Sequence, residues 1–379
     1  MKNPKVIIAL IMSIFVCLLV FSSCSSNATS TNSTTATSAA STTESSTPTS
    51  TEATSTEKNN KDIVLGNVVI TLANGYHQAD TMHFEKYAKE KYGVQTIIMD
   101  GEENTEKIVN AIDQLIAKGV DAIVVQCIFG DTINESIYAA HEAGIPILTF
   151  YNKQTEAKNP FLTINEAKTS FQMGKLAAEK WQEAHPGTPI NMAVIEYEGV
   201  LTVETQRSNP FIEGVLSVDP KAVLASRLDG GGTREAAMAV AQDMLQAHPE
   251  INILYGVSSD YALGALAAFE AIGRGKAENG VPITEIVIGT DAPTSELVKL
   301  FDPSSSFKIT QGLTPKDNAE MKVDLMMKMI NGELAMDKDE KFEAFDMMID
   351  YWNSDIDEIQ EWTEIQYSSK INLKDEINK

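Results

Sequence analysis

Cys127 and His141 are the first residues in this chain whose types suggest catalysis. A cysteine with a histidine nearby forms a nucleophile and general base in several enzyme classes. Cys127 lies in an apolar stretch with Val124, Val125 and Ile128. We therefore interpret this cysteine as an inert residue at the end of a strand.

Three further patterns suggest metal or phosphate binding, and each lacks a necessary part. His77 and His83 have no carboxylate or cysteine at metal-ligand spacing, so His77 is better interpreted as a hydrogen-bonding group for a ligand. The run DKDEKFE lacks the glycine and final glutamate of a calcium loop and reads as a solvated charge run. The run DGGGTRE lacks the ending of a P-loop and the dinucleotide-binding spacing, which favours a turn. We expect no metal, no cofactor and no enzymatic activity.

The elements that would position a binding site alternate between strand and helix. Eight short apolar runs rich in β-branched residues predict strands: GNVVITLA, VQTIIMDG, DAIVVQC, GIPILTFY, PINMAVIEY, AVLASRL, INILYGV and TEIVIGTD. Helical patterns separate them. In TEKIVNAIDQLIAKG, Ile108, Ile112, Leu115 and Ile116 share one face, and Gly119 supplies a stop.

This alternation predicts an α/β fold with parallel sheets covered by helices on both faces. The pattern starts again at PINMAVIEY, with later helices expected at 165–184, 203–216, 233–247 and 260–273. Two such sheets make two lobes, and the ends of their strands face a crevice between them.

Six segments in a fixed order resemble the type I periplasmic sugar-binding proteins, the ribose- and galactose-binding receptors of ABC transporters. They are KGVDAIVVQ, AAHEAGIPILTFYN, QRSNPFIEGV, AHPEINILYGVSSDYALGALAAFEAIG, IVIGTDAP and KITQGLTP, and the similarity covers 67 to about 362. The resemblance implies two Rossmann-like lobes joined by three crossovers, closing on a small ligand. We place the lobe boundaries at 62–151 with 312–345, and at 152–311 with 346–366, followed by a tail at 367–379.

The resemblance also implies a binding site. Arg207 matches the family's arginine, whose fixed fork of donors suits adjacent sugar oxygens. Asp291, in GTD, matches the aspartate that accepts hydroxyl protons, and Gln311, in ITQ, matches the glutamine near the last crossover.

Elsewhere the sequence departs from the family. After the first strand it has NGYHQ, which makes Asn74, Tyr76, His77 and Gln78 candidates. Relatives have a carboxylate residue after the third strand, and Phe129 stands at that position in this chain. Asp131 is the alternative if the loop is shifted relative to the loop of the family. The other candidates replace charged or amide residues of relatives: Tyr151, Asn152, Ser258 (followed by Ser259) and Asp260.

The departures leave two interpretations of the ligand. Phe129, Tyr76 and Tyr151 would stack on an apolar face, which favours a deoxy sugar, a nucleoside-like ring or a small autoinducer. The alternative is an ordinary monosaccharide or related polyol held by a rearranged set of polar groups.

The amino-terminal region predicts export and anchoring. Lys2 and Lys5 precede an apolar run from Val6 to Phe21 and small residues before Cys24. This resembles a bacterial lipoprotein signal at 1–23 with Cys24 as the lipidated residue, although the family usually has Leu where Phe21 stands. A retained membrane span is the alternative, but the run is shorter than a bilayer requires.

Residues 24–61 are rich in Ser and Thr, with almost no large apolar side chains after Cys24, and read as a disordered tether. The composition would also suit an O-glycosylated stalk. The 53 acidic and 30 basic residues give a formal net charge of -23, which argues against nucleic-acid partners. Only Cys127 would remain unmodified after export, so we expect no intrachain disulfide.

The resemblance, the signal and the charge together favour a solute receptor on the outer face of the cell membrane. It would deliver its ligand to an ABC transporter permease, and nothing in the sequence indicates oligomerisation, so we expect a monomer. A sensor that presents a ligand to a signalling receptor is the alternative. A transcription regulator of the same fold would need an amino-terminal DNA-binding helix pair, where this chain has a signal and a tether.

Overall fold

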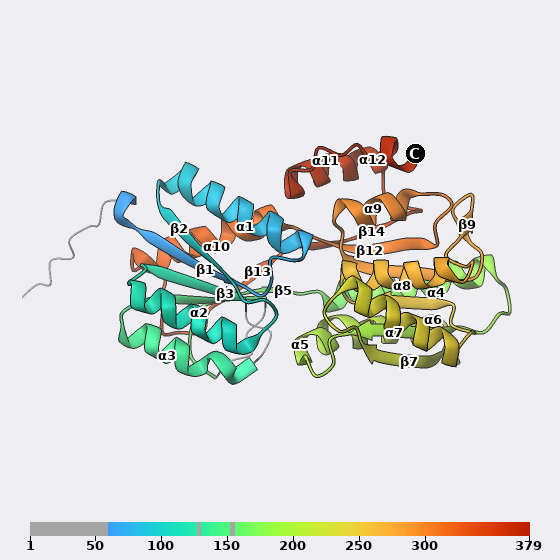
Figure 1. Ribbon diagram of the computed structural model, residues 1–379, viewed down its shortest axis with the longest axis horizontal. Helices are drawn as coiled ribbons and strands as arrows, with labels where there is room; N and C mark the ends of the chain where they lie inside the picture. Colours follow the sequence, from blue (N-terminus) through green and yellow to red (C-terminus); the bar gives the residue numbers. More distant parts are fainter. Residues whose placement is uncertain (1–59, 127–129, 152–155) are drawn as a thin grey trace, which may run out of the picture. The chain divides into compact units, whose positions relative to one another are not determined.

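The computed structural model describes residues 60–126, 130–151 and 156–379. Within the compact unit Glu57–Lys379, strands and helices alternate and build two six-stranded sheets (Figure 1). This architecture confirms the predicted α/β class and the two Rossmann-like lobes. The predictions for the signal, Cys24 and nearly all of the tether lie outside the described residues.

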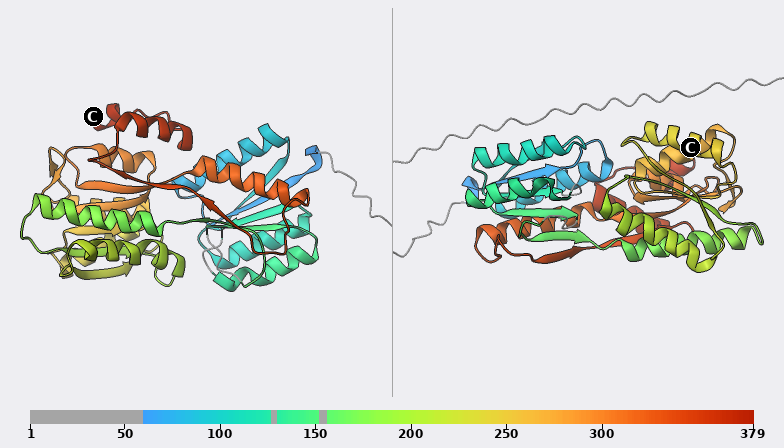
Figure 2. Two further views of the ribbon diagram at one scale, coloured as in Figure 1. Left: turned by 180° about the vertical axis from the view of Figure 1, so that it is seen from behind. Right: turned by 90° about the horizontal axis from the view of Figure 1, so that it is seen from below.

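The first lobe is built on a wholly parallel sheet with the strand order β13-β5-β4-β3-β1-β2. Helices cover both faces of the sheet, with α1 packed against α10 and α2 against α3 (Figure 2). The strands are β1 (Val64–Val69), β2 (Gln95–Asp100), β3 (Ala122–Gln126), β4 (Ile147–Tyr151), β5 (Phe161–Ile164) and β13 (Lys341–Ala344). The helices are α1 (Gly75–Tyr87), α2 (Thr105–Lys118), α3 (Asn134–Glu142) and α10 (Pro315–Ile330).

The second lobe repeats this order as β14-β12-β11-β8-β6-β7, with β14 antiparallel to β12. Its strands are β6 (Asn191–Glu196), β7 (Val223–Asp229), β8 (Ile253–Gly256), β11 (Ile286–Asp291), β12 (Phe307–Leu313) and β14 (Asp346–Asp350), with a small hairpin of β9 (Ala277–Glu278) and β10 (Val281–Pro282). Its helices are α4 (Ala167–Ala184), α5 (Leu201–Val203), α6 (Asn209–Val218), α7 (Arg234–Ala247), α8 (Ser259–Ala271) and α9 (Thr294–Phe301).

Local sequence features explain individual elements. Helix α2 begins where the Asn104 side chain accepts from the Lys107 amide and ends at Gly119, whose φ of 68° favours glycine. Its apolar face is buried as predicted. Helices α4 and α6 approach closely because Gly174 and Gly214 lack side chains: a Cβ at either position would lie about 2 Å from a backbone oxygen of the other helix.

The chain crosses between the sheets three times in the described region. It leaves the first sheet after β5, returns after β12 at Thr314, and crosses again at Phe345 between β13 and β14. The predicted boundary at 151 therefore needs correction, because β5 pairs with β4 in the first sheet and the lobe continues to Ile164. The later crossovers lie at Thr314 and Phe345, where the predicted boundaries are 311/312 and 345/346.

The carboxyl-terminal segment is helical and contacts both lobes. Helix α11 (Ile356–Tyr367) packs against α1 and α10 of the first lobe and against α9 of the second. Helix α12 (Leu373–Ile377) packs on α9, within the region expected to be a tail. This segment therefore adds a contact between the lobes beside the three crossovers.

Candidate ligand-binding site

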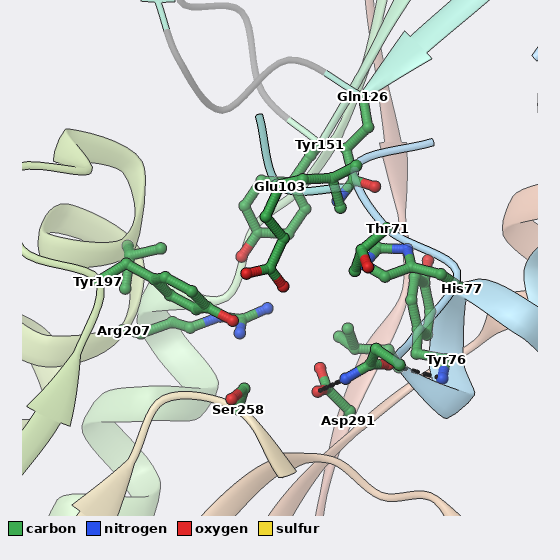
Figure 3. Close-up of a pocket in the computed structure, with 14 residues that line it drawn as sticks. Thr71, Tyr76, His77, Glu103, Gln126, Tyr151, Tyr197, Arg207, Ser258 and Asp291 are labelled. Carbon is green, nitrogen blue, oxygen red and sulfur yellow. Dashed lines mark hydrogen bonds between the residues drawn. The ribbon is translucent and has the colours of Figure 1, made fainter. Parts of the chain in front are cut away.

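A cavity lies where the carboxyl ends of strands from both sheets meet, and it encloses about 70 Å³ (Figure 3). Most of its lining residues lie at or within three residues after the end of a strand. Seven of the predicted residues line the cavity: Asn74, Tyr76, His77, Tyr151, Arg207, Ser258 and Asp291. Their assignment to ligand binding stays a prediction.

Arg207 is held rigidly by a buried counter-charge. It lies in a π-helical turn (Glu204–Ser208), and its guanidinium donates from Nε and Nη2 to the two carboxylate oxygens of Glu166, at 2.9 and 2.7 Å. Its Nη1 donates to the Val257 carbonyl at 2.5 Å. Burial opposes the charge of Arg207, but Glu166 outweighs it, and the pKa of Arg207 is raised. The fork of donors is thus fixed, and two of its five N–H groups remain for a ligand.

Asp291 is the last residue of β11 and is 6% exposed. Its Oδ2 accepts from the Ser259 amide at 3.3 Å and from the Asn74 side chain of the first lobe at 3.4 Å. Burial raises its pKa, while Arg207 lowers it. Its φ of 91° is unusual for a residue with a side chain, and such backbone strain is concentrated at ligand sites.

His77 contributes an uncharged imidazole. Burial, with the positive charges of Lys322 and Arg207, lowers the pKa of His77 to about 3. At neutral pH the ring therefore has one donor and one acceptor nitrogen, which suits a hydroxyl group.

Tyr76 and Tyr151 present ring surface to the cavity while their hydroxyls are engaged elsewhere. The Tyr76 hydroxyl accepts from Asn318 at 2.8 Å, and the Tyr151 hydroxyl donates to Glu166. The Arg207 guanidinium lies 5.4 Å from the Tyr151 ring centroid. These contacts fix both rings in place and leave their faces as the apolar part of the lining.

Four predicted site residues lie outside the lining. Gln78 is exposed and donates to the Leu72 carbonyl, and Asp131 accepts from Asn134 and the Glu156 amide. Asp260 pairs with Arg234, and Gln311 is fully buried and donates to Asp346 at 2.6 Å. Because each of the four residues bonds to another protein group and none lines the cavity, we leave them out of the proposed site. Phe129 and Asn152 lie outside the described residues.

The fold brings to the cavity several residues that were not predicted from the sequence. Thr71, Glu103, Gln126 and Tyr197 each lie at or after the end of a strand and line it (Figure 3). Glu166, at the first crossover, was also missed, although it neutralises Arg207. Proximity to a strand end was the available signal for the first four. No sequence signal marked Glu166, because its partner Arg207 lies in a distant segment of the chain.

A second cavity of about 220 Å³ adjoins the first and shares Ile70, Glu103 and Tyr197 with it. Its remaining lining comes from the second lobe and includes Asp229 and Tyr261. The combined space is lined by hydrogen-bonding groups, aromatic rings and few apolar side chains, which suits a small polar ligand.

The described residues carry no group of three or more His, Cys, Asp or Glu side chains able to hold a metal ion. Within the same residues, no helix is both long enough and apolar enough to span a bilayer.

Comparison with known protein families gives one match over most of the folded region: residues 65–334 match the periplasmic binding protein domain. The ribose import binding protein of Bacillus subtilis is 25% identical over 255 residues, which cover 67% of this chain and 77% of that protein. The galactofuranose-binding protein YtfQ of Escherichia coli is 25% identical over 206 residues, covering 53% of this chain and 63% of that protein.

Solved structures share the fold. A periplasmic solute-binding protein of Actinobacillus succinogenes with bound D-allose superposes with a TM-score of 0.63 and 24% identity, covering 76% of this chain and 98% of that one. The arabinose-transporter binding protein of Shewanella sp. ANA-3, bound to L-arabinofuranose, gives a TM-score of 0.66 with 17% identity, covering 83% and 98%.

Proposed function

This chain belongs to the periplasmic binding protein family, as its resemblance to the type I sugar-binding members implied, and from that premise we propose that it captures a monosaccharide or related polyol between its two lobes. The family is extracytoplasmic and consists of substrate-binding proteins, not enzymes. Relatives are named for ribose and galactofuranose, and structural neighbours hold D-allose and L-arabinofuranose.

One observation carries the proposal: polar groups with unused hydrogen-bonding capacity from both lobes converge on one cavity. Arg207 and Asp291 from the second lobe offer fixed donors and an acceptor, and His77 and Gln126 from the first offer neutral groups of both kinds. Sugar hydroxyls donate and accept at once, so such a mixed lining matches them. Ligand contacts made with both lobes would stabilise the closed arrangement.

We further propose that the receptor is lipid-anchored at Cys24 and passes its ligand to an ABC transporter permease. The anchor is supported by the apolar run before Cys24 and the Ser/Thr-rich segment after it. Export of a Cys24→Ala variant to the culture medium, with wild type retained in the membrane fraction, would support the anchor. Equal retention of both would contradict it.

The binding proposal is tested by thermal unfolding of residues 25–379 with pentoses, hexoses, amino sugars, deoxy sugars, polyols and nucleosides. A ligand that binds only the folded state raises the unfolding midpoint by mass action. We expect a concentration-dependent rise with at least one sugar class. Shifts confined to deoxy sugars or nucleosides would favour the aromatic interpretation of the ligand, and no shift across the panel would contradict sugar binding.

A further inference from the structure

Glu103 brings a negative charge to the cavity that no described cation balances. Arg207 is already bonded to both carboxylate oxygens of Glu166, and its influence extends to Asp291. In the described part of the chain, the Glu103 carboxylate has neither a hydrogen bond nor an ion pair. Figure 3 shows this carboxylate pointing into the centre of the site. Glu103 is exposed, so water hydrates its carboxylate in the free protein, and a charged ligand group could replace that water.

The loop that carries Glu103 is held in a defined shape. After β2, Asp100 Oδ1 accepts from the Leu72 and Glu102 amides at 3.2 and 2.9 Å, and the Glu103 amide donates to the Ile70 carbonyl at 2.7 Å. Glu102 and Glu103 both have positive φ, at 48° and 55°, which costs of order 1 kcal/mol each. Because the loop keeps this strained conformation, the fold sets the direction of the Glu103 Cα–Cβ bond.

Glu103 reaches across to the second lobe at the junction of the two cavities. It lines both of them, and its Oε2 lies 2.7 Å from the place that a Cβ on Gly232 would occupy. The run DGGGTRE, interpreted above as a turn, thus also leaves room for this carboxylate. A ligand group beyond the ring in the first cavity would meet Glu103 at this junction.

The charges around the junction are predominantly negative. Asp260 is paired with Arg234, but Glu103, Asp229 and Asp291 have no basic partner within ion-pair distance in the described residues. Burial, with the nearby charges of Asp260 and Asp100, raises the pKa of Glu103. A phosphate or carboxylate on the ligand would be repelled here, whereas a cation would relieve the repulsion.

Aromatic rings complete the surroundings. Tyr197 and Tyr261 lie with their ring centroids 4.8 Å apart beside the same space, and Tyr197 lines both cavities. A ring face next to a carboxylate suits an ammonium group, which is attracted by both.

We propose that the ligand is an amino sugar or an amino-substituted polyol whose protonated amine is received by Glu103 at the junction of the two cavities. This inference rests on the proposed sugar-binding function and narrows its substrate class. It assigns Glu103 as the residue that distinguishes an amine from a hydroxyl.

The test is isothermal titration of residues 25–379 with three matched sets: glucosamine, galactosamine and mannosamine, their parent hexoses, and their N-acetyl forms. We expect at least one amino sugar to bind about tenfold or more tightly than both its parent and its acetylated form, because acetylation removes the charge. Glu103→Gln should abolish most of that preference. Glu102→Gln makes the same change one residue away, where the side chain pairs with Lys107, and should preserve it.

Two outcomes would overturn the inference. If parent hexoses bind as tightly as their amino forms, or if Glu103→Gln keeps the preference, the amine assignment fails while the sugar-binding function stands. If the wild type binds no member of the three sets but binds another sugar in the unfolding panel, the inference also fails alone. Absence of binding in both experiments would count against the function itself.

Discussion

Tyr151 in the first lobe and Asp291 in the second occupy the same position in their sheets. Tyr151 ends β4, the third strand from the β13 edge of its sheet, and Asp291 ends β11, the third strand from the β14 edge. Both residues have a strongly positive φ, 89° for Tyr151 and 91° for Asp291. Yet one lobe places an aromatic ring there and the other a carboxylate. The two lobes thus use the same strained strand end for different parts of the lining.

The lobes differ further in how firmly they hold their polar groups. In the second lobe, Arg207 and Asp291 are bonded to buried or backbone partners. In the first lobe, Glu103 and Gln126 have side chains without a hydrogen-bond partner among the described residues. The second lobe is therefore preorganised, and we expect its site residues to affect both folding and binding. Glu103 and Gln126 of the first lobe should affect binding alone.

Arg207→Ala should have the largest effect and act on both properties. It leaves Glu166, which is fully buried, without its counter-charge, and breaking a buried ion pair costs about 3 kcal/mol or more. Loss of the charged hydrogen bonds should also weaken ligand binding by at least about 1.5 kcal/mol, roughly tenfold. Urea unfolding and isothermal titration would measure the two effects.

The double variant Arg207→Ala with Glu166→Gln separates the effect on stability from the effect on ligand binding. It removes the uncompensated charge, so most of the stability should return while ligand affinity stays low. Recovery of affinity together with stability would show that Arg207 acts only through folding, and unchanged stability in the single variant would contradict the preorganised second lobe.

For the buried lysines in the described part of the chain, it is the first lobe that supplies a carboxylate partner and the second that does not. Lys322, in the first lobe, pairs with Asp80, whereas Lys308, in the second, donates to the Asp302 carbonyl at 2.7 Å and lies over the Tyr351 ring. Both lysines are almost completely buried. The second lobe therefore fixes charges at its site but leaves one amine in its core without a carboxylate in ion-pair contact among the described residues.

Burial lowers the pKa of Lys308 from 10.5 to about 7. Between these values the unfolded chain binds more protons than the folded one, so the Lys308 contribution to the free energy of unfolding rises with pH. The slope is at most about 1.4 kcal/mol per pH unit, or about 2 kcal/mol from pH 7 to 9. Wild type should gain that much relative to Lys308→Met in urea unfolding across this range. Parallel pH curves for the two proteins would refute the assignment.

Eight of the twelve strands in the two sheets were predicted from the sequence, and β5, β12, β13 and β14 were not. The predicted strands follow from local patterns of alternating strand and helix, whereas Arg207 and Asp291 were predicted from the resemblance to the sugar-binding family. Gln311 shows the limit: every residue of β12 is buried, so alternation cannot tell which side chains face the cavity. Glu103 and Glu166 depend on contacts between distant segments, which no local pattern encodes.

The same substitution at one glutamine in each lobe tests whether the lobes also differ in how firmly they hold neutral side chains. Gln126 is 8% exposed with no side-chain partner among the described residues, so Gln126→Leu should change stability by less than about 0.5 kcal/mol and lower ligand affinity by about 1 kcal/mol, roughly fivefold. Gln311→Leu removes a hydrogen bond to Asp346 and should cost about 1 kcal/mol of stability. Urea unfolding and titration of both variants decide the matter. Equal stability losses would mean that Gln126 is as firmly held as Gln311, and the contrast between the lobes would not extend to their neutral side chains.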